Sequence, residues 1–201
     1  MIIADDVVQG TQEWWDVRLG IPTSSGFGKI VTTTGKSSTQ RKKYMYKLSV
    51  ERILRVSEDN YTSKYMDRGK ELEPQARAFY ELFSGLEAKE VGFCYKDEKK
   101  LYGCSPDGLV GDDGLLEIKA PTSAVHVEYL LGGKLPTAYF SQVQGQLFVT
   151  GRKFCHFFSF YPGLKPFMIK VLPDVEFHKV LEIELDKFVN ELTEVEKTLK
   201  Q

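Results

Sequence analysis

A predicted β-hairpin between Ser105 and Lys119 constrains the fold of this chain more than any other feature. Asp112-Asp113-Gly114 has the Asp-Gly pattern of a tight turn, and short apolar segments at 109–110 and 115–118 flank it. Because side chains alternate between the two faces of a strand, Glu117 and Lys119 share one face, and the apolar residues beside them share the other. The sequence therefore predicts a sheet whose hairpin presents an acid and a lysine on the same side.

The same hairpin brings a second acid to that position. Asp107 stands at the start of the first strand, so the turn returns the chain beside it at Glu117. Two carboxylates at the end of a sheet offer the hard oxygen ligands that magnesium and manganese prefer. Lys119 could hold or activate a water there, or offset charge that develops on a phosphate. A solvated surface hairpin explains this spacing equally well, because acidic turns are common.

The length and composition describe an ordinary globular chain. Its 201 residues fit one domain, 1–201, and 42% hydrophobic and 27% charged residues exclude a disordered or collagen-like chain. No apolar run approaches the roughly 18 residues of a membrane span, and the acidic start is not a signal peptide. We therefore expect a cytoplasmic protein with no membrane partner. The cysteines and histidines are scattered, so we expect them to pack rather than to bind metal.

Helices, then strands with helices between them, then a closing helix follow one another along the chain. We expect helices at 11–19, 24–31, 40–56, 64–83 with an interruption near Pro74, 124–131, 137–150 and 175–199. We expect strands at 88–95, 101–104, 109–110, 115–119, 153–161 and 166–171. Thr11 is expected to cap the first helix, and Ser24 or Ser25 the second. This order predicts an α/β domain in which helices flank one central mixed β-sheet.

Charge is distributed unevenly although the net charge is only -1. Between Lys36 and Arg55 there are seven basic residues and one acid, whereas residues 174–201 hold eight acids and four lysines. A basic face on a nearly neutral domain can bind a polyanion such as nucleic acid. The solvated side of a helix is the alternative interpretation of the basic segment.

Three segments contribute residues that suit one hydrolytic site. A helix carries Glu73, the hairpin carries Asp107 and then the pair Glu117 and Lys119, and a later helix carries Gln142. A helical acid, a strand acid, a strand Glu-x-Lys pair and a glutamine, in this order, are the parts of a PD-(D/E)XK nuclease. The order makes the surface hairpin the weaker of the two interpretations.

The chain resembles the lambda-type phage exonucleases, also described as YqaJ-like viral recombinases, over nearly its full length. The matching residues are Gln9 to Trp14, Arg18 to Gly20, Thr23 to Ser25, Arg68 to Lys70 with Glu73 and Arg77, Cys104 to Leu109, Leu116 to Lys119 with Pro121, and Tyr139 with Gln142 to Gln144. The resemblance implies a restriction-endonuclease-like core. It also implies a Mg²⁺-dependent deoxyribonuclease, in which Mn²⁺ can substitute and two ions are expected.

The resemblance assigns roles to the residues of the hairpin and of the helix before it. Asp107 and Glu117 correspond to the metal-binding carboxylates, and the backbone carbonyl of Ile118 corresponds to a further ligand. Glu73 corresponds to the helical acid that completes the metal site, directly or through water. Lys119 corresponds to the residue that positions or deprotonates the attacking water. The four side chains are the expected catalytic set.

A second set matches positions that bind the 5′-terminal phosphate in this family. Its members are Arg18, Ser25, Ser105 and Gln142, and one guanidinium with three neutral donors suits a phosphate. An ion pair with an acid of its own helix is the alternative for Arg18. A helix N-cap is the alternative for Ser25, and it is compatible with a phosphate at the same place.

Four further residues are expected at the DNA. Met66 stands where related enzymes carry an apolar wedge that splits the terminal base pairs, with a core position as its alternative. Tyr139 belongs to the matching segment before Gln142. The loop at 32–40 departs from the lambda pattern, so we expect Lys36 or Arg41 to replace an arginine contact there. Ala124 also departs from that pattern, and the DNA contact at its position is missing or replaced.

The function implied by the resemblance is 5′-to-3′ exonuclease activity on the 5′-phosphorylated ends of double-stranded DNA. Such an enzyme releases 5′-mononucleotides and leaves a 3′ overhang for recombination. The resemblance further implies a phage or prophage protein in the cytoplasm of a bacterial host, a ring-shaped homotrimer, and a single-strand annealing protein as partner. One alternative is a PD-(D/E)XK endonuclease or nicking enzyme, which would lack the Arg18 and Ser25 set. The other is a DNA-binding subunit without catalysis, which has no need of Lys119.

Overall fold

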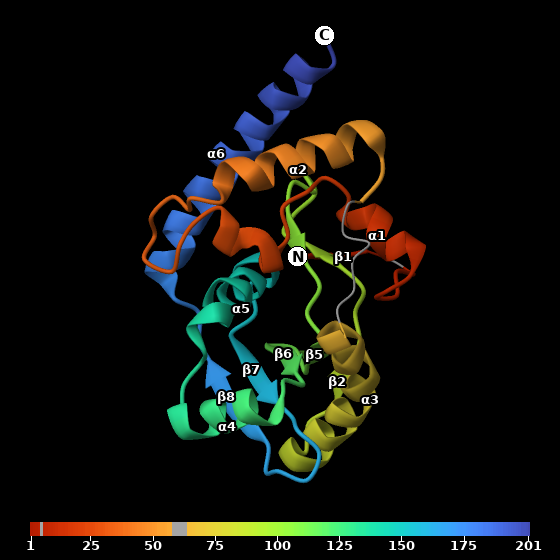
Figure 1. Ribbon diagram of the computed structural model, residues 1–201, viewed down its shortest axis with the longest axis vertical. Helices are drawn as coiled ribbons and strands as arrows, with labels where there is room; N and C mark the ends of the chain where they lie inside the picture. The colour runs from red at the N-terminus through yellow and green to blue at the C-terminus, as the bar shows by residue number, and fades with distance from the viewer. Residues whose placement is uncertain (5, 58–63) are drawn as a thin grey trace.

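A five-stranded mixed β-sheet forms the centre of the computed structural model, which describes residues 1–4, 6–57 and 64–201 without the side chains of 64–66 (Figure 1). Its strand order is β2-β5-β6-β7-β8. The strands are β2 (Ala88–Lys89), β5 (Gly108–Val110), β6 (Gly114–Lys119), β7 (Phe154–Ser159) and β8 (Phe167–Val171). All neighbours are antiparallel except β6 and β7, which run parallel. The predicted α/β fold with a central mixed sheet is confirmed.

Helices cover both faces of this sheet, so β6 is buried along most of its length. On one face, Ala76 and Tyr80 of α3 (Lys64–Ser84) pack with Leu116 and Ile118. The other face packs Leu115 against α5 (Thr137–Thr150) and α6 (Val175–Leu199). The shorter α4 (Ser123–Gly132) contacts β8. Since Glu117 lies on the face of α5, the alternation predicted along β6 is confirmed.

A second, three-stranded sheet has the order β1-β3-β4. It contains β1 (Ile2–Ile3), β3 (Cys94–Tyr95) and β4 (Gly103–Cys104), all antiparallel. The single strand predicted at 88–95 is therefore wrong, because β2 and β3 belong to different sheets. The N-terminal segment separates them: a Cβ built at Gly92 would lie 2.0 Å from the carbonyl oxygen of Val7. The chain around Val7 therefore packs against the backbone at Gly92, where the predicted strand is interrupted.

The first two helical segments differ in how well they match expectation. Thr11 caps α1 (Gln12–Arg18) by accepting a hydrogen bond from the Trp14 backbone N–H, as predicted. The second segment is a 3-10 helix, η1 (Ser24–Lys29), which begins after Thr23 and has no side-chain cap. The cap predicted at Ser24 or Ser25 is wrong. A Cβ at Gly26 would lie 2.2 Å from the Tyr44 hydroxyl, so this segment is held by close packing.

The basic and acidic segments of the chain lie against each other. The basic helix α2 (Arg41–Leu54) packs along α6, and Figure 1 shows the two at one end of the molecule. Arg41 forms ion pairs with Glu184 and Glu191. Arg52 lies 3.4 Å from Glu196. Part of the basic charge is therefore neutralised inside the domain and does not form a free face.

The helix α3 runs through Pro74 without a break, so Pro74 is inside the helix and not in the first turn of a new one. A proline inside a helix lacks one N–H donor and leaves one carbonyl without its helical partner. Pro74 is exposed, so water can take that place. None of the described helices is long and apolar enough to cross a membrane.

Candidate active site

Asp107 and Glu117 meet where β5 begins. Gly108 pairs with Leu116 in the antiparallel register, which places Asp107 opposite Glu117. The Oδ2 atom of Asp107 accepts a hydrogen bond of 2.6 Å from the backbone N–H of Ile118. In an antiparallel strand the N–H and C=O of one residue point to the same side, so the Ile118 carbonyl faces the Asp107 side. The predicted convergence of the two acids is confirmed.

Glu73 approaches the same place from α3. Its carboxylate pairs with Arg77 at 3.3 Å. Glu73, Asp107, Lys119 and Tyr139 all line one cavity of about 430 Å³. Glu73 and Asp107 also line a second cavity, of about 410 Å³, toward the N-terminal segment. The helical acid is therefore close to the hairpin, with open space on both sides of it.

Glu117 is almost completely buried, with 1% of its surface exposed, and three donors hold its carboxylate. The Lys119 ammonium (2.5 Å) and the Gln142 side-chain amide (2.7 Å) donate to Oε1. The Gln146 amide donates to Oε2 at 2.6 Å. Bonds of this kind to an ionised acceptor are stronger than neutral ones. The strand alternation thus delivers Glu117 and Lys119 to a common face, and α5 closes over it.

The charges at this site perturb one another. Burial, followed by the charges of Glu117 and Glu73, raises the pKa of Asp107 well above its usual range, and Lys119 offsets this in part. Burial opposes the charge of Lys119, but the carboxylates of Glu117 and Asp107 outweigh it and raise the pKa of this lysine. Lys119 is therefore an ammonium ion that balances two acids.

The donor set of the site suits a hard divalent cation. Carboxylate oxygens and a backbone carbonyl are the ligands that such a cation prefers. The pKa of Asp107 is raised first by burial and then by the negative charges of Glu117 and Glu73, and a bound cation would favour its ionised form. The described residues contain no group of three His, Cys, Asp or Glu side chains already placed around a common point. Glu117 in particular directs its oxygens to Lys119 and the two glutamines.

The four residues predicted to bind a 5′-phosphate fall into two groups. The Arg18 guanidinium lies 3.7 Å from the Trp14 ring centroid. The Trp14 indole N–H donates to the Ser105 hydroxyl at 2.8 Å, so Trp14 connects Arg18 to Ser105. Ser25 and Gln142 line another cavity, of about 440 Å³, between η1 and the start of α5. Gln142 joins that cavity to the carboxylates, because its amide also holds Glu117.

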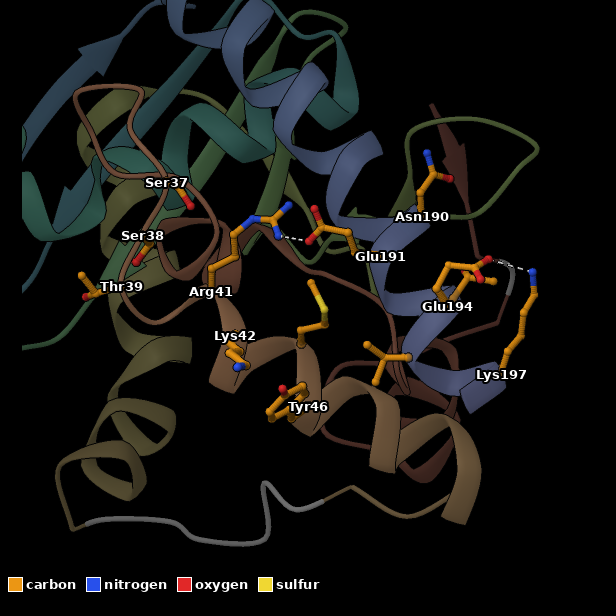
Figure 2. A pocket seen from close by; sticks show the side chains of 13 residues that line it. Ser37, Ser38, Thr39, Arg41, Lys42, Tyr46, Asn190, Glu191, Glu194 and Lys197 are labelled. Carbon is orange, nitrogen blue, oxygen red and sulfur yellow. Dashed lines mark hydrogen bonds and ion pairs between the residues drawn. The ribbon is translucent and has the colours of Figure 1, made fainter. Parts of the chain in front are cut away.

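The residues predicted at the DNA differ in their surroundings. The Tyr139 ring lies 5.2 Å from the Lys119 ammonium, beside the carboxylates. Lys36 is exposed in the loop before α2. Arg41 is 12% exposed, bound to acids of α6, and lines a groove of about 980 Å³ between α2 and α6 (Figure 2). This groove, larger than either carboxylate cavity, contains none of the predicted catalytic residues. The side chain of Met66 lies outside the described part of the chain.

Three residues that hold the site had no role assigned from sequence. Gln146 binds Glu117. Arg68 donates to the carbonyls of Ala120 (3.1 Å) and Pro121 (2.7 Å), directly after Lys119. Gln9 donates to the carbonyls of Val91 and Pro106, next to Asp107. All three are in or beside matching motifs, and the helical spacing of Gln146 from Gln142 is a signal that could have identified it.

A mixed sheet with a helical acid, two strand acids and a lysine at one end defines a nuclease core. A family model described as the YqaJ-like viral recombinase domain matches residues 13–153. The chain belongs to this family, and it is a nuclease.

Solved structures agree with this assignment. An alkaline exonuclease (LHK-Exo) from Laribacter hongkongensis is 35% identical, with a TM-score of 0.86 over 94% of this chain and 96% of that one. The same protein in complex with dAMP is 36% identical, with the same TM-score and coverage. A phage-related exonuclease from Haemophilus somnus 129PT, 16% identical with a TM-score of 0.68 over 87% of this chain and 95% of that one, shares the fold. No curated protein matches the chain.

Proposed function

We propose that this protein is a Mg²⁺-dependent exonuclease that degrades one strand of double-stranded DNA from its 5′ end. It would release 5′-mononucleotides and leave a 3′ single-stranded overhang for recombination by annealing. The observation that carries the proposal is the cavity that Glu73, Asp107 and Lys119 line together. The buried Glu117 lies directly behind it, opposite Asp107 and bonded to Lys119. Membership of the family and 35% identity to an alkaline exonuclease support the same class of reaction.

The residues that would hold Mg²⁺, or Mn²⁺ in its place, are Asp107, Glu117, the Ile118 carbonyl and Glu73, the last directly or through water. We expect two ions. When bound, such ions activate water and stabilise charge on the phosphate. Asp107 supports this assignment, because it lines the cavity and its carboxylate is buried beside the charges of Glu117 and Glu73.

Lys119 would hold the attacking water and offset charge that develops on the scissile phosphate. Its raised pKa keeps it an ammonium ion, which favours positioning over proton removal. Tyr139, on the same cavity, would contact the nucleotide being removed. Arg68 would keep the backbone after Lys119 in place through its two carbonyl contacts.

The 5′-phosphate would be recognised by Arg18, Ser25, Ser105 and Gln142. Gln142 supports a link between end recognition and chemistry, since it touches Glu117 and also lines the cavity of Ser25. Lys36 is the more available of the two basic residues expected at the DNA, because Arg41 is bound to α6. Met66 remains a proposed wedge.

We extend the proposal to the assembly and the setting of the enzyme. A homotrimeric ring would keep a domain with a net charge of -1 on a polyanion by enclosing it. A single-strand annealing protein would receive the overhang. The protein would act in the cytoplasm of a bacterial host that carries the phage or prophage.

One experiment tests the reaction and its polarity. The protein is incubated with linear duplex bearing 5′-phosphates, with its 5′-hydroxyl counterpart and with closed circular DNA, first with Mg²⁺ and then with EDTA. We expect release of 5′-mononucleotides from linear DNA only, faster from phosphorylated ends, and none with EDTA. Cleavage of circular DNA would indicate an endonuclease, and binding without cleavage would indicate a DNA-binding subunit.

Two substitutions separate chemistry from end recognition. Lys119→Ala should abolish cleavage and leave DNA binding intact. Arg18→Ala should slow the enzyme chiefly on phosphorylated ends. Equal losses on both kinds of end would contradict the phosphate-binding role of Arg18.

A further inference from the structure

Gln146 is a buried side chain whose amide nitrogen binds Glu117. It is 0% exposed, and its amide nitrogen donates to Glu117 Oε2 at 2.6 Å. Its amide oxygen is also buried and has no hydrogen-bond partner among the described residues. An unsatisfied buried carbonyl costs stability. The orientation of the Gln146 side chain is therefore set by its bond to Glu117 and not by a partner for its own oxygen.

Gln142 and Gln146 each donate to a different carboxylate oxygen of Glu117. They are four residues apart on α5, so they lie on the same face of the helix, above β6. Gln142 lines a cavity and could touch a substrate. Gln146 is enclosed, so any effect it has on cleavage must pass through Glu117.

The two carboxylate oxygens of Glu117 differ in how many donors they accept, and Gln146 binds the one with fewer. A carboxylate has about four acceptor positions, two on each oxygen. Oε1 already accepts from Lys119 and Gln142, whereas Oε2 accepts from Gln146 alone. The oxygen with remaining capacity for a further ligand is therefore the one whose position Gln146 sets.

We propose that Gln146 is a positioning residue that orients Glu117 so that Oε2 is available to a divalent cation. The inference rests on the proposed function, in which Glu117 is a metal ligand. Partners that orient a ligating carboxylate typically change metal affinity or activity by about tenfold to a hundredfold when they are removed. Gln146 would change metal affinity by a similar factor without contacting the DNA.

The test compares Gln146→Met with Gln144→Met. Methionine keeps the length and flexibility of glutamine but cannot donate a hydrogen bond. Gln144 is a matched control: it is on the same helix, is 2% exposed, and bonds to the backbone of Leu172 and Asp174 and to His178, not to Glu117. Gln146→Leu is measured alongside, so that a folding defect in one variant leaves the comparison intact.

Three quantities are measured for each protein: the affinity for Mn²⁺ alone by calorimetric titration, kcat and KM on linear duplex, and thermal stability. For Gln146→Met we expect Mn²⁺ affinity and kcat to fall about tenfold to a hundredfold, with KM for DNA changed by less than about twofold. Stability should change little, because removal of the unsatisfied carbonyl offsets part of the cost of removing the donor to Glu117 Oε2. For Gln144→Met we expect lower stability and unchanged metal affinity.

Two results would overturn the inference: Mn²⁺ affinity of both Gln146 variants within about twofold of the unchanged protein, or an equal loss of affinity in Gln144→Met. Glu117→Gln separates this failure from failure of the proposed function. If Glu117→Gln still cleaves DNA, the proposed site is wrong. If it does not cleave and the Gln146 variants do so normally, only the role of Gln146 is wrong.

Discussion

Replacing Arg68 by methionine should loosen the chain directly after Lys119. The Arg68 guanidinium donates to the carbonyls of Ala120 and Pro121 and lies 5.1 Å from the Tyr161 ring. Each charged hydrogen bond contributes about 1 kcal/mol after allowance for partial exposure, and the ring contact about 0.5 kcal/mol. The expected loss of unfolding free energy is therefore about 2.5 kcal/mol.

For a chain of this length, that loss corresponds to a fall in Tm of about 5–10 °C, which circular dichroism would measure. Lys70→Met is the control, because Lys70 lines the same cavity from the same helix and is exposed. Turnover on linear DNA should fall by about tenfold or more in Arg68→Met, since the backbone that carries Lys119 loses its anchor. A stability change no larger than that of Lys70→Met would refute the reasoning.

Three further predictions concern charge and packing. Asp107→Asn should abolish cleavage and yet have a higher Tm than the unchanged protein near pH 8. The difference in Tm should shrink toward pH 4, because the raised pKa of Asp107 makes its ionised form costly in the folded state. In that Asp107→Asn background, the free energy of unfolding measured with urea should fall as the pH is lowered from about 7.5 to 5.5. Burial lowers the pKa of His156 and His178 below 6.5, so the unfolded chain takes up protons before the folded chain does. A flat pH profile would contradict this. Gly92→Ala should lower unfolding free energy by about 1–3 kcal/mol, because its new Cβ would meet the Val7 carbonyl, and an unchanged urea midpoint would disprove that contact.

The sequence predicts best those elements whose signals are local. The expected helices at 137–150 and 175–199 have the same bounds in the structure, because apolar periodicity and flanking residues act within a few turns. The hairpin was equally predictable, since its turn and its alternation are both short-range. The convergence of Asp107 with Glu117 follows from that hairpin alone.

What could not be predicted depends on residues far apart in the chain. The strand expected at 88–95 is divided because Val7 approaches Gly92, and no pattern within those eight residues records that approach. The charges along the sequence indicated a basic helix and an acidic one, but not that acids of α6 would form ion pairs with Arg41. Gln142 was assigned to a phosphate from its motif, whereas its contact with Glu117 depends on how α5 lies over β6.

The placement of Glu117 and Lys119 two residues apart on one strand has an evolutionary consequence. Their Cα atoms are separated by one pleat repeat, about 6.6 Å, a spacing that the backbone itself sets. Insertions in the turn at Asp112–Gly114, or changes in the covering helices, can alter the surroundings of the site without moving these two residues relative to each other. Loops and helices of such an enzyme can therefore diverge under selection while the acid and the lysine keep their separation.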